Sequence, residues 1–149
     1  MRYLEWLDKT VGDRVSSGVI GAPVFLRADL QLAADHGLLG PLAGAAVESA
    51  VRWLNASVHS IYALGGAAAG NVTVMAEFSG GQSALLSAEM IWDGDASAQL
   101  LIIGQKGSLR IDDFPELPQL KGSPAAGKRW HDAILRSIEA GKPVVMARE

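Results

Sequence analysis

The sequence predicts one α+β domain, built on an open, largely antiparallel β-sheet with helices packed on one face. Segments with alternating apolar residues cluster in the middle of the chain, between residues 71 and 113, where glycine-containing turns separate them. Segments with helical periodicity lie before and after this cluster, an order that favours α+β over repeated βαβ units. No repeat or linker divides the 149 residues, so we expect a single domain over residues 1–149.

The first part of the chain predicts a helix followed by a long strand. Apolar residues recur at spacings of three and four over residues 2–17, and Gly18 is expected to end this helix. Its inward positions are Leu4, Leu7, Val11 and Val15. Residues 24–34 alternate as a half-buried strand does. Its apolar face is expected to hold Val24, Leu26, Ala28, Leu30 and Leu32. Residues 35–41 contain glycines and a proline and are interpreted as a loop.

A second helix and a second strand follow. The helix is predicted over residues 42–56, with the apolar stripe Val47, Ala50, Val51 and Leu54. Glu48, Ser49 and Arg52 are expected outside the centre of this stripe. Residues 57–65 contain β-branched and aromatic residues and predict a strand.

The alternating region predicts the rest of the sheet, and the chain ends in a third helix. Four strands are expected, over residues 72–78, 84–92, 98–103 and 108–112. Gly80 and Gly81 predict a two-glycine hairpin turn, since glycine tolerates positive φ at both positions. The last helix is predicted over residues 128–140, with Trp130, Ile134, Leu135 and Ile138 facing inward. Gly141 is expected to cap it, before a small edge strand at residues 144–146.

One face of the predicted sheet is only half apolar. The residues expected on it are Thr73, Met75, Glu77, Leu85, Ser87, Glu89, Ile91, Leu101 and Ile103. A mixed face of this kind is often an interface between subunits. We therefore expect a homodimer or homotetramer that forms through the open sheet face.

Composition excludes several classes of function. The chain has no cysteine, which removes disulfides, thiolate metal sites and thiol nucleophiles. A net charge of −3 gives no broad basic field for nucleic acid or an anionic membrane surface. No apolar run approaches the roughly 18 residues of a spanning helix, and the N-terminus does not resemble a signal peptide. These observations favour a cytoplasmic protein that binds neither nucleic acid nor membrane.

Several phrases, taken in order, resemble the C-terminal domain of the Gfo/Idh/MocA oxidoreductases, the relatives of glucose–fructose oxidoreductase and inositol dehydrogenase. The phrases lie at residues 17–24, 50–54, 58–63, 78–81, 103–109, 130–134 and 141–143. Together they cover nearly the whole chain. The resemblance implies a glyceraldehyde-3-phosphate-dehydrogenase-like C-terminal domain that binds substrate and oligomerises. In full-length members an N-terminal Rossmann domain binds NAD or NADP.

The motifs that carry the family's chemistry are missing here. The sequence lacks both the glycine-rich fingerprint of the nucleotide domain and the Glu-Lys-Pro segment that supplies the working lysine. The family's Asp, His and Asp, matched by spacing back from Arg52, fall at Leu42, Ala46 and Ser49, and none of these three can relay a proton. We therefore expect no catalytic residue, cofactor-binding residue or metal ligand in this chain.

Three residues are candidates for facing a substrate. Asp35 and His36 form an Asp-His pair in the predicted loop, and such a pair can act as a general base. Arg52 could contact an anionic group, although a charge on the helix surface is the simpler interpretation. The other histidines, His59 and His131, lie in a strand and at a helix start and have no metal-ligand spacing.

These observations give a first hypothesis and two alternatives. The first is a substrate-binding and oligomerisation domain of an NAD(P)-dependent oxidoreductase acting on a sugar or polyol, inactive alone. In this case the helix from Arg2 begins where an interdomain connection of the family would end, which is consistent with a truncated chain. The second is a stand-alone binding or scaffold protein that kept the sheet and lost the chemistry. The third is an enzyme that uses Asp35 and His36.

Overall fold

The computed structural model describes residues 2–33, 39–91, 97–113 and 128–146. In chain order the elements are α1 (Arg2–Ser16), β1 (Pro23–Ala33), α2 (Leu39–Leu54), β2 (Val58–Gly66), the 3-10 turn η2 (Ala67–Ala69), β3 (Asn71–Phe78), β4 (Ser83–Ile91), β5 (Ser97–Gly104), β6 (Ser108–Asp113), α3 (Lys128–Ala140) and β7 (Val144–Val145). The predicted helices and strands are all present, with ends that differ by a few residues.

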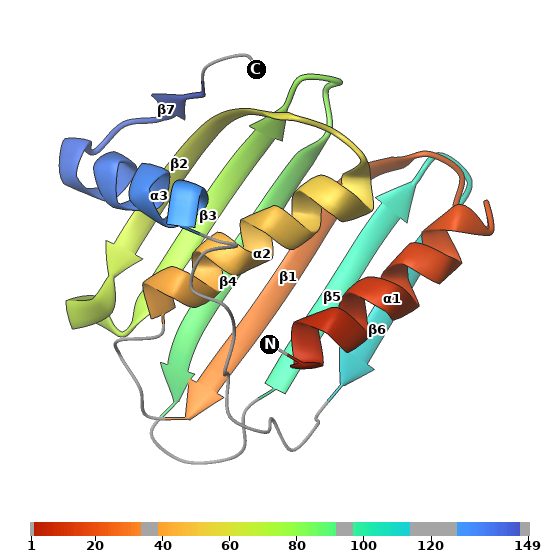
Figure 1. The fold of residues 1–149 in the computed structure, drawn as a ribbon, viewed down its shortest axis with the longest axis horizontal. Coiled ribbons are helices and arrows are strands. Elements are labelled where there is room, and N and C mark those ends of the chain that lie inside the picture. Colours follow the sequence, from red (N-terminus) through yellow and green to blue (C-terminus); the bar gives the residue numbers. More distant parts are fainter. Residues whose placement is uncertain (1, 34–38, 92–96, 114–127, 147–149) are drawn as a thin grey trace.

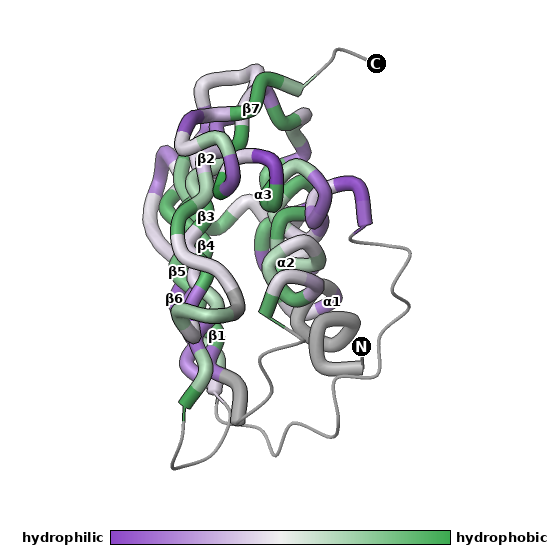
Figure 2. Tube along the Cα trace, turned by 90° about the vertical axis from the view of Figure 1, so that its left-hand side faces the viewer, coloured by the Kyte–Doolittle hydropathy of each residue, from purple (hydrophilic) through white to green (hydrophobic). Residues whose placement is uncertain are grey.

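The strands form one sheet in the order β6-β5-β1-β4-β3-β2-β7 (Figure 1). Among the described strands every pairing is antiparallel except β1 with β4. The three helices lie on the same side of the sheet, and no described element covers the other side (Figure 2). This arrangement confirms the predicted α+β class and the open, largely antiparallel sheet.

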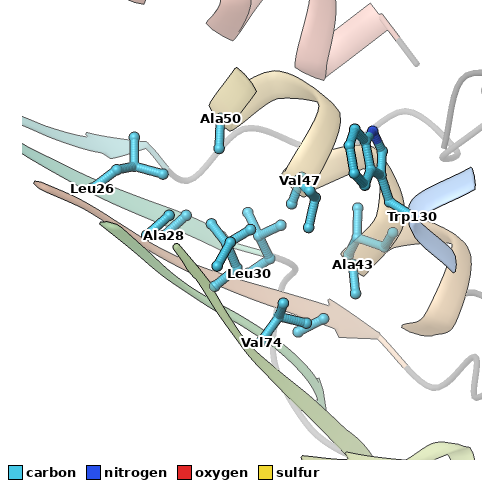
Figure 3. Packing of buried hydrophobic residues seen from close by; sticks show 14 of the residues in the cluster. Leu26, Ala28, Leu30, Ala43, Val47, Ala50, Val74 and Trp130 are labelled. Carbon is cyan, nitrogen blue, oxygen red and sulfur yellow. The ribbon is translucent and has the colours of Figure 1, made fainter. Parts of the chain in front are cut away.

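The core lies between the sheet and α2, which crosses the central strands (Figure 3). Leu26, Ala28 and Leu30 alternate along β1 and meet α2 with every second side chain, as the strand period requires. Val47 on α2 and Val74 on β3 are fully buried among them. Several core positions on both layers are alanine, which lets the helix sit close to the sheet. These are Ala28, Ala43, Ala46, Ala50, Ala63, Ala76, Ala84, Ala88 and Ala98.

Two predicted turns differ from the structure. The segment interpreted as a loop over residues 35–41 ends earlier, because α2 begins at Leu39 and includes Pro41 in its first turn. Proline is tolerated there because the first N–H groups of a helix have no intrahelical partner. In the β3–β4 hairpin only Gly81 has positive φ, at 88°. The Gly81 N–H donates to the Phe78 carbonyl and the Phe78 N–H to the Gln82 carbonyl, so this is a longer turn with one left-handed glycine.

For three side chains, the periodicity of the sequence predicts the wrong degree of burial. Ser49 is fully buried on α2, whereas Leu135 on α3 is 50% exposed. Val24 is 40% exposed because the register of β1 shifts between Pro23 and Phe25, and this irregularity turns it away from the core. A similar shift between Val58 and Ser60 in β2 explains why Val58 and Ile61 are both buried despite their odd spacing.

A buried serine joins α3 to the edge of the sheet. Ser137 is fully buried, and its hydroxyl accepts a hydrogen bond from the Ala63 N–H of β2 at 2.9 Å. The same hydroxyl donates to the Lys142 carbonyl, just past the end of α3, at 2.8 Å. Because β7 pairs only with Ser60 and Ile61, Ser137 satisfies a backbone group of β2 that lies beyond this short strand.

Ser137→Ala is therefore expected to lower the free energy of unfolding by about 1–3 kcal/mol, since it leaves a buried N–H without a partner. Urea unfolding followed by circular dichroism measures this change. Ser17→Ala is a matched control, because the Ser17 hydroxyl also bonds a backbone carbonyl, that of Arg14, but at an exposed helix end. A loss for Ser137→Ala no larger than that for Ser17→Ala would contradict the assignment.

Candidate functional site

Of the three candidate substrate-facing residues, the described part of the chain contains one, Arg52. Asp35 and His36 lie outside the described residues. Arg52 lies in the last turn of α2 with about half of its side chain exposed. Its guanidinium lies 3.6 Å from the Glu48 carboxylate one turn earlier and donates to the Ser49 hydroxyl at 3.2 Å. Arg52 thus belongs to a polar cluster on α2.

Glu48 connects this cluster to α3. The Trp130 indole N–H donates to one carboxylate oxygen of Glu48, while the other faces Arg52. Trp130 is 5% exposed, and the guanidinium of Arg129 lies over its ring, 4.6 Å from the centroid. The chain Arg52–Glu48–Trp130–Arg129 fixes the orientation of the indole at the start of α3. A buried indole ordinarily needs such a partner for its N–H.

The positions that the family resemblance marks as catalytic carry no acid or base. Leu42 and Ala46 are buried on the side of α2 that meets the core, and Ser49 is fully buried beside Arg52. A hydroxyl held in this way accepts the arginine N–H and cannot serve as a base at neutral pH. Ser49 thus contributes its hydroxyl to the polar cluster around Arg52.

The described histidines are separated from one another. His59 is exposed near the start of β2, and its carbonyl accepts the Met146 N–H. His131, on α3, packs so closely on Gly40 of α2 that a Cβ at position 40 would overlap its ring. Within the described ranges, no three acidic or histidine side chains gather as metal ligands would. None of the helices in those ranges is long and apolar enough to cross a bilayer.

A groove of about 650 Å³ opens beside the Trp130 cluster, between α2, α3 and the ends of β2 and β3. We call it the α3 groove. Its lining includes Val51, His59, Phe78, Arg129, Trp130 and Met146. Segments far apart in the sequence meet here because β7 returns the chain to the edge of β2 after α3. The groove has an apolar floor and a polar rim.

Over β6, β5 and β1 the open face of the sheet carries its charges in two parallel rows, while Glu77 on β3 and Glu89 on β4 lie on the same face outside both rows. We call the first row the arginine row. Strand pairing places one residue from each of six strands side by side in it, in the order Arg110, Leu101, Arg27, Leu85, Met75 and Tyr62. The second row, which we call the aspartate row, is displaced by two residues on each strand and contains Asp112, Gln99, Asp29, Ser87, Thr73 and Leu64. Arg27 and Asp29 pair at 3.1 Å. A depression of about 250 Å³ lies among the charged ends of both rows.

Sequence reasoning missed Glu48, Arg129 and Trp130 as a group. The spacing of Glu48 and Arg52 does signal a pair on one helix face. The contact of Glu48 with Trp130 joins residues 82 apart in the chain, and no local pattern predicts it. Trp130 itself was predicted to face inward, which is confirmed.

Comparison with known proteins identifies the fold. No protein-family model and no curated protein matches the sequence. A probable dehydrogenase from Thermotoga maritima is 16% identical, with a TM-score of 0.75 over 97% of this chain and 62% of that one. The myo-inositol 2-dehydrogenase of Lactobacillus plantarum is 14% identical, with a TM-score of 0.74 over 94% of this chain and 61% of that one.

The scyllo-inositol dehydrogenase of Lactobacillus casei, solved with bound NAD(H) and scyllo-inositol, is 14% identical and has a TM-score of 0.71 over 93% of this chain and 61% of that one. This chain thus spans 61–62% of the length of the dehydrogenases it resembles. At such identities the likeness establishes the fold. The resemblance inferred from the sequence is confirmed at that level: the chain has the fold of a part of the Gfo/Idh/MocA-type inositol dehydrogenases.

Proposed function

We propose that this chain is the substrate-binding and oligomerisation domain of an NAD(P)-dependent oxidoreductase that acts on a sugar or polyol, and that it does not transfer hydride by itself. The observation that carries the proposal is the structural match over 97% of this chain to 62% of a dehydrogenase. The neighbour solved with scyllo-inositol supports a polyol as the substrate class. The buried, non-ionisable side chains at positions 42, 46 and 49 support the absence of acid-base chemistry.

The partner in this proposal is a second copy of the chain, bound through the open sheet face. Met75 on β3 is 53% exposed and Leu64 on β2 is 52% exposed, so apolar surface is available there. The two charged rows make the β6–β5–β1 part of the face complementary to itself. When two copies meet about a two-fold axis that runs along the rows, each arginine row lies opposite the aspartate row of the other copy.

Sedimentation and a cofactor titration test the two halves of this proposal. The purified chain is expected to sediment with at least twice its 15.6 kDa mass. It is also expected to leave the fluorescence of added NADH unchanged. A monomer at high micromolar concentration would contradict the oligomerisation role. A saturable NADH signal would contradict the absence of a cofactor site.

A second candidate function is a binding or scaffold protein that does no redox chemistry. The α3 groove favours it, because a formed groove of about 650 Å³ lies within the usual size range of ligand sites. The intact mass of the protein isolated from its own cells distinguishes the two. A mass larger by about 120–150 residues, the size of a nucleotide-binding domain, supports the oxidoreductase, and a mass near 15.6 kDa supports the binding protein.

A further inference from the structure

β6 ends the sheet on one side and presents an edge of backbone groups. Among the described strands it pairs with β5 alone. An edge strand offers a row of N–H and C=O groups to which another strand can bind. At the opposite edge, β7 has only two residues, and the Ser137 hydroxyl already binds the Ala63 N–H beyond it. With six residues, β6 is the longer of the two edge strands in the described part of the chain.

The turn between β5 and β6 determines which backbone groups of β6 point away from the sheet. The Gly104 N–H donates to the Gly107 carbonyl at 2.8 Å, so these two residues form a hydrogen-bonded pair where the hairpin begins. Along an antiparallel ladder such pairs alternate with non-hydrogen-bonded pairs, and the register of β5 with β6 runs without a shift. Ile111 therefore directs its backbone groups toward β5. Arg110 and Asp112 direct theirs outward.

A second copy of β6 fits this edge in one register. When two β6 strands pair antiparallel about Ile111, Arg110 of each copy lies opposite Asp112 of the other. Both residues direct their backbone groups outward, so each of these two pairs can exchange two main-chain hydrogen bonds. Moving the second copy by two residues would place Arg110 opposite Arg110, or Asp112 opposite Asp112, and like charges directly opposite destabilise a sheet. The charges of β6 therefore select the register about Ile111.

The side chains on the two faces of β6 agree with this register. Arg110 and Asp112 are exposed on the open face, where opposite charges on paired strands stabilise the pair. On the helix side, Ile111 is partly buried against the core and meets Ile111 of the second copy. This is a non-hydrogen-bonded pair, in which side chains come closest. One face of the new strand pair is thus held by charge and the other by apolar contact.

We propose that the outer edge of β6 is a second self-association surface, on which another copy of this chain adds its own β6 antiparallel about Ile111. The sheet then continues from one copy into the next across a two-fold axis. This edge contact uses a different surface from the open sheet face, so it can hold or fail independently of the association proposed above.

The two contacts together would close a tetramer. The axis of the edge pair passes beside Ile111, which lies midway between the arginine row and the aspartate row on β6. The axis of the face-to-face pair runs along the same midline. Two two-fold axes that cross at a right angle generate a closed assembly of four copies. The tetramer, unlike the edge contact itself, rests on the proposed face-to-face association.

Arg27→Glu isolates the edge contact, because Arg27 lies on β1, separated from β6 by β5, and its reversal opposes the aspartate row with like charge. This variant is expected to sediment as a dimer at about 0.5 mM chain. In that dimer the N–H groups of Arg110 and Asp112 are expected to exchange with deuterium as slowly as the N–H of Ile111, which faces β5. Residue-resolved hydrogen exchange followed by NMR measures this. In an unpaired edge strand the two outward groups exchange much faster.

Asp112→Pro in the same background is expected to weaken the edge dimer at least about 100-fold, because proline removes the outward N–H. The fold is expected to survive, because this N–H makes no bond to β5 and proline is tolerated at such positions of an edge strand. Asp112→Ala is the matched control, since it removes the same carboxylate and keeps the N–H. It is expected to weaken the dimer by no more than about tenfold.

Thermal unfolding checks that both Asp112 variants are folded. A monomeric Arg27→Glu chain, fast exchange at Arg110 and Asp112 in its dimer, or equal weakening by proline and alanine overturns the edge contact. An unmodified chain that associates while both N–H groups exchange fast supports the open sheet face and also overturns the edge contact. Slow exchange in the Arg27→Glu dimer supports the edge contact, whatever becomes of the face-to-face association.

Discussion

The double variant Arg27→Glu with Arg110→Glu is expected to sediment as a monomer at concentrations where the proposed association makes the unmodified chain a dimer. These substitutions make the arginine row acidic, so that it meets the aspartate row of a second copy with like charge. Like charges opposed across an interface cost several kcal/mol, and we expect self-association to weaken at least about 100-fold. Folding is expected to survive, because the Arg27–Asp29 pair is exposed and such pairs contribute about 0–1 kcal/mol.

The complementary variant, Asp29→Lys with Asp112→Lys, makes both rows basic and is expected to be a monomer as well. Mixed in equal amounts, the two variants are expected to form a heterodimer, because each row again meets the opposite charge. Analytical ultracentrifugation of each variant and of the mixture measures this. Arg136→Glu, on the helix side of the molecule, controls for the change in net charge. Dimers of either variant alone, or a mixture that stays monomeric, would count against the proposed two-fold axis.

Gly104→Ala is expected to lower the free energy of unfolding by about 3 kcal/mol, the upper part of the range for overpacking. A Cβ at position 104 would come within 2.9 Å of the Ile20 carbonyl carbon and closer still to its oxygen. That oxygen already accepts the Lys106 N–H at 2.8 Å, and the Gln105 N–H donates to the Ala22 carbonyl at 3.0 Å. Backbone held in this way cannot yield as a flexible side chain does. The melting temperature is expected to fall by about 6–12 °C.

Gly107→Ala is the matched control for this prediction. Gly107 lies in the same turn between β5 and β6, but a Cβ there would have no heavy atom within 4 Å. We expect a change within about 0.5 kcal/mol. Calorimetric melting of the two variants side by side makes the comparison. Equal melting temperatures would show that the turn can move away from Ile20.

Much of the fold could be predicted because strong local patterns coincide with tertiary burial. The alternation in β3 and β4 and the apolar stripe of α2 both face the core as predicted. Prediction failed where long-range contact overrode the pattern. Ser49 and Ser137 are buried because each has a hydrogen-bond partner, Arg52 in one case and the edge of β2 in the other. Leu135 is exposed because α3 contacts α2 and β2 through its other side.

The candidate sites were harder to predict, and for a physical reason. The charge rows of the open face depend on how β1 pairs with β4 and β5. The sequence of any one strand does not determine its register with its neighbours. The α3 groove gathers side chains from α2, β2, β3 and α3. Of the candidate residues predicted from the sequence, Arg52 contacts Glu48, which in turn accepts a hydrogen bond from Trp130 in the lining of the groove. Asp35 and His36 lie outside the described residues.

The position of β1 between β4 and β5 has a consequence for the order in which the chain can fold. Phe25 pairs with Ser83 on one side and with Ile103 on the other, so the middle of the sheet closes only when segments far along the chain have arrived. The β2–β3–β4 meander, by contrast, needs only short loops. Closing a long loop costs conformational entropy before the contacts that it allows can stabilise the chain. The meander is therefore expected to form first, and β1 to insert late. During synthesis, β1 must therefore wait with both edges unpaired until β4 and β5 have left the ribosome.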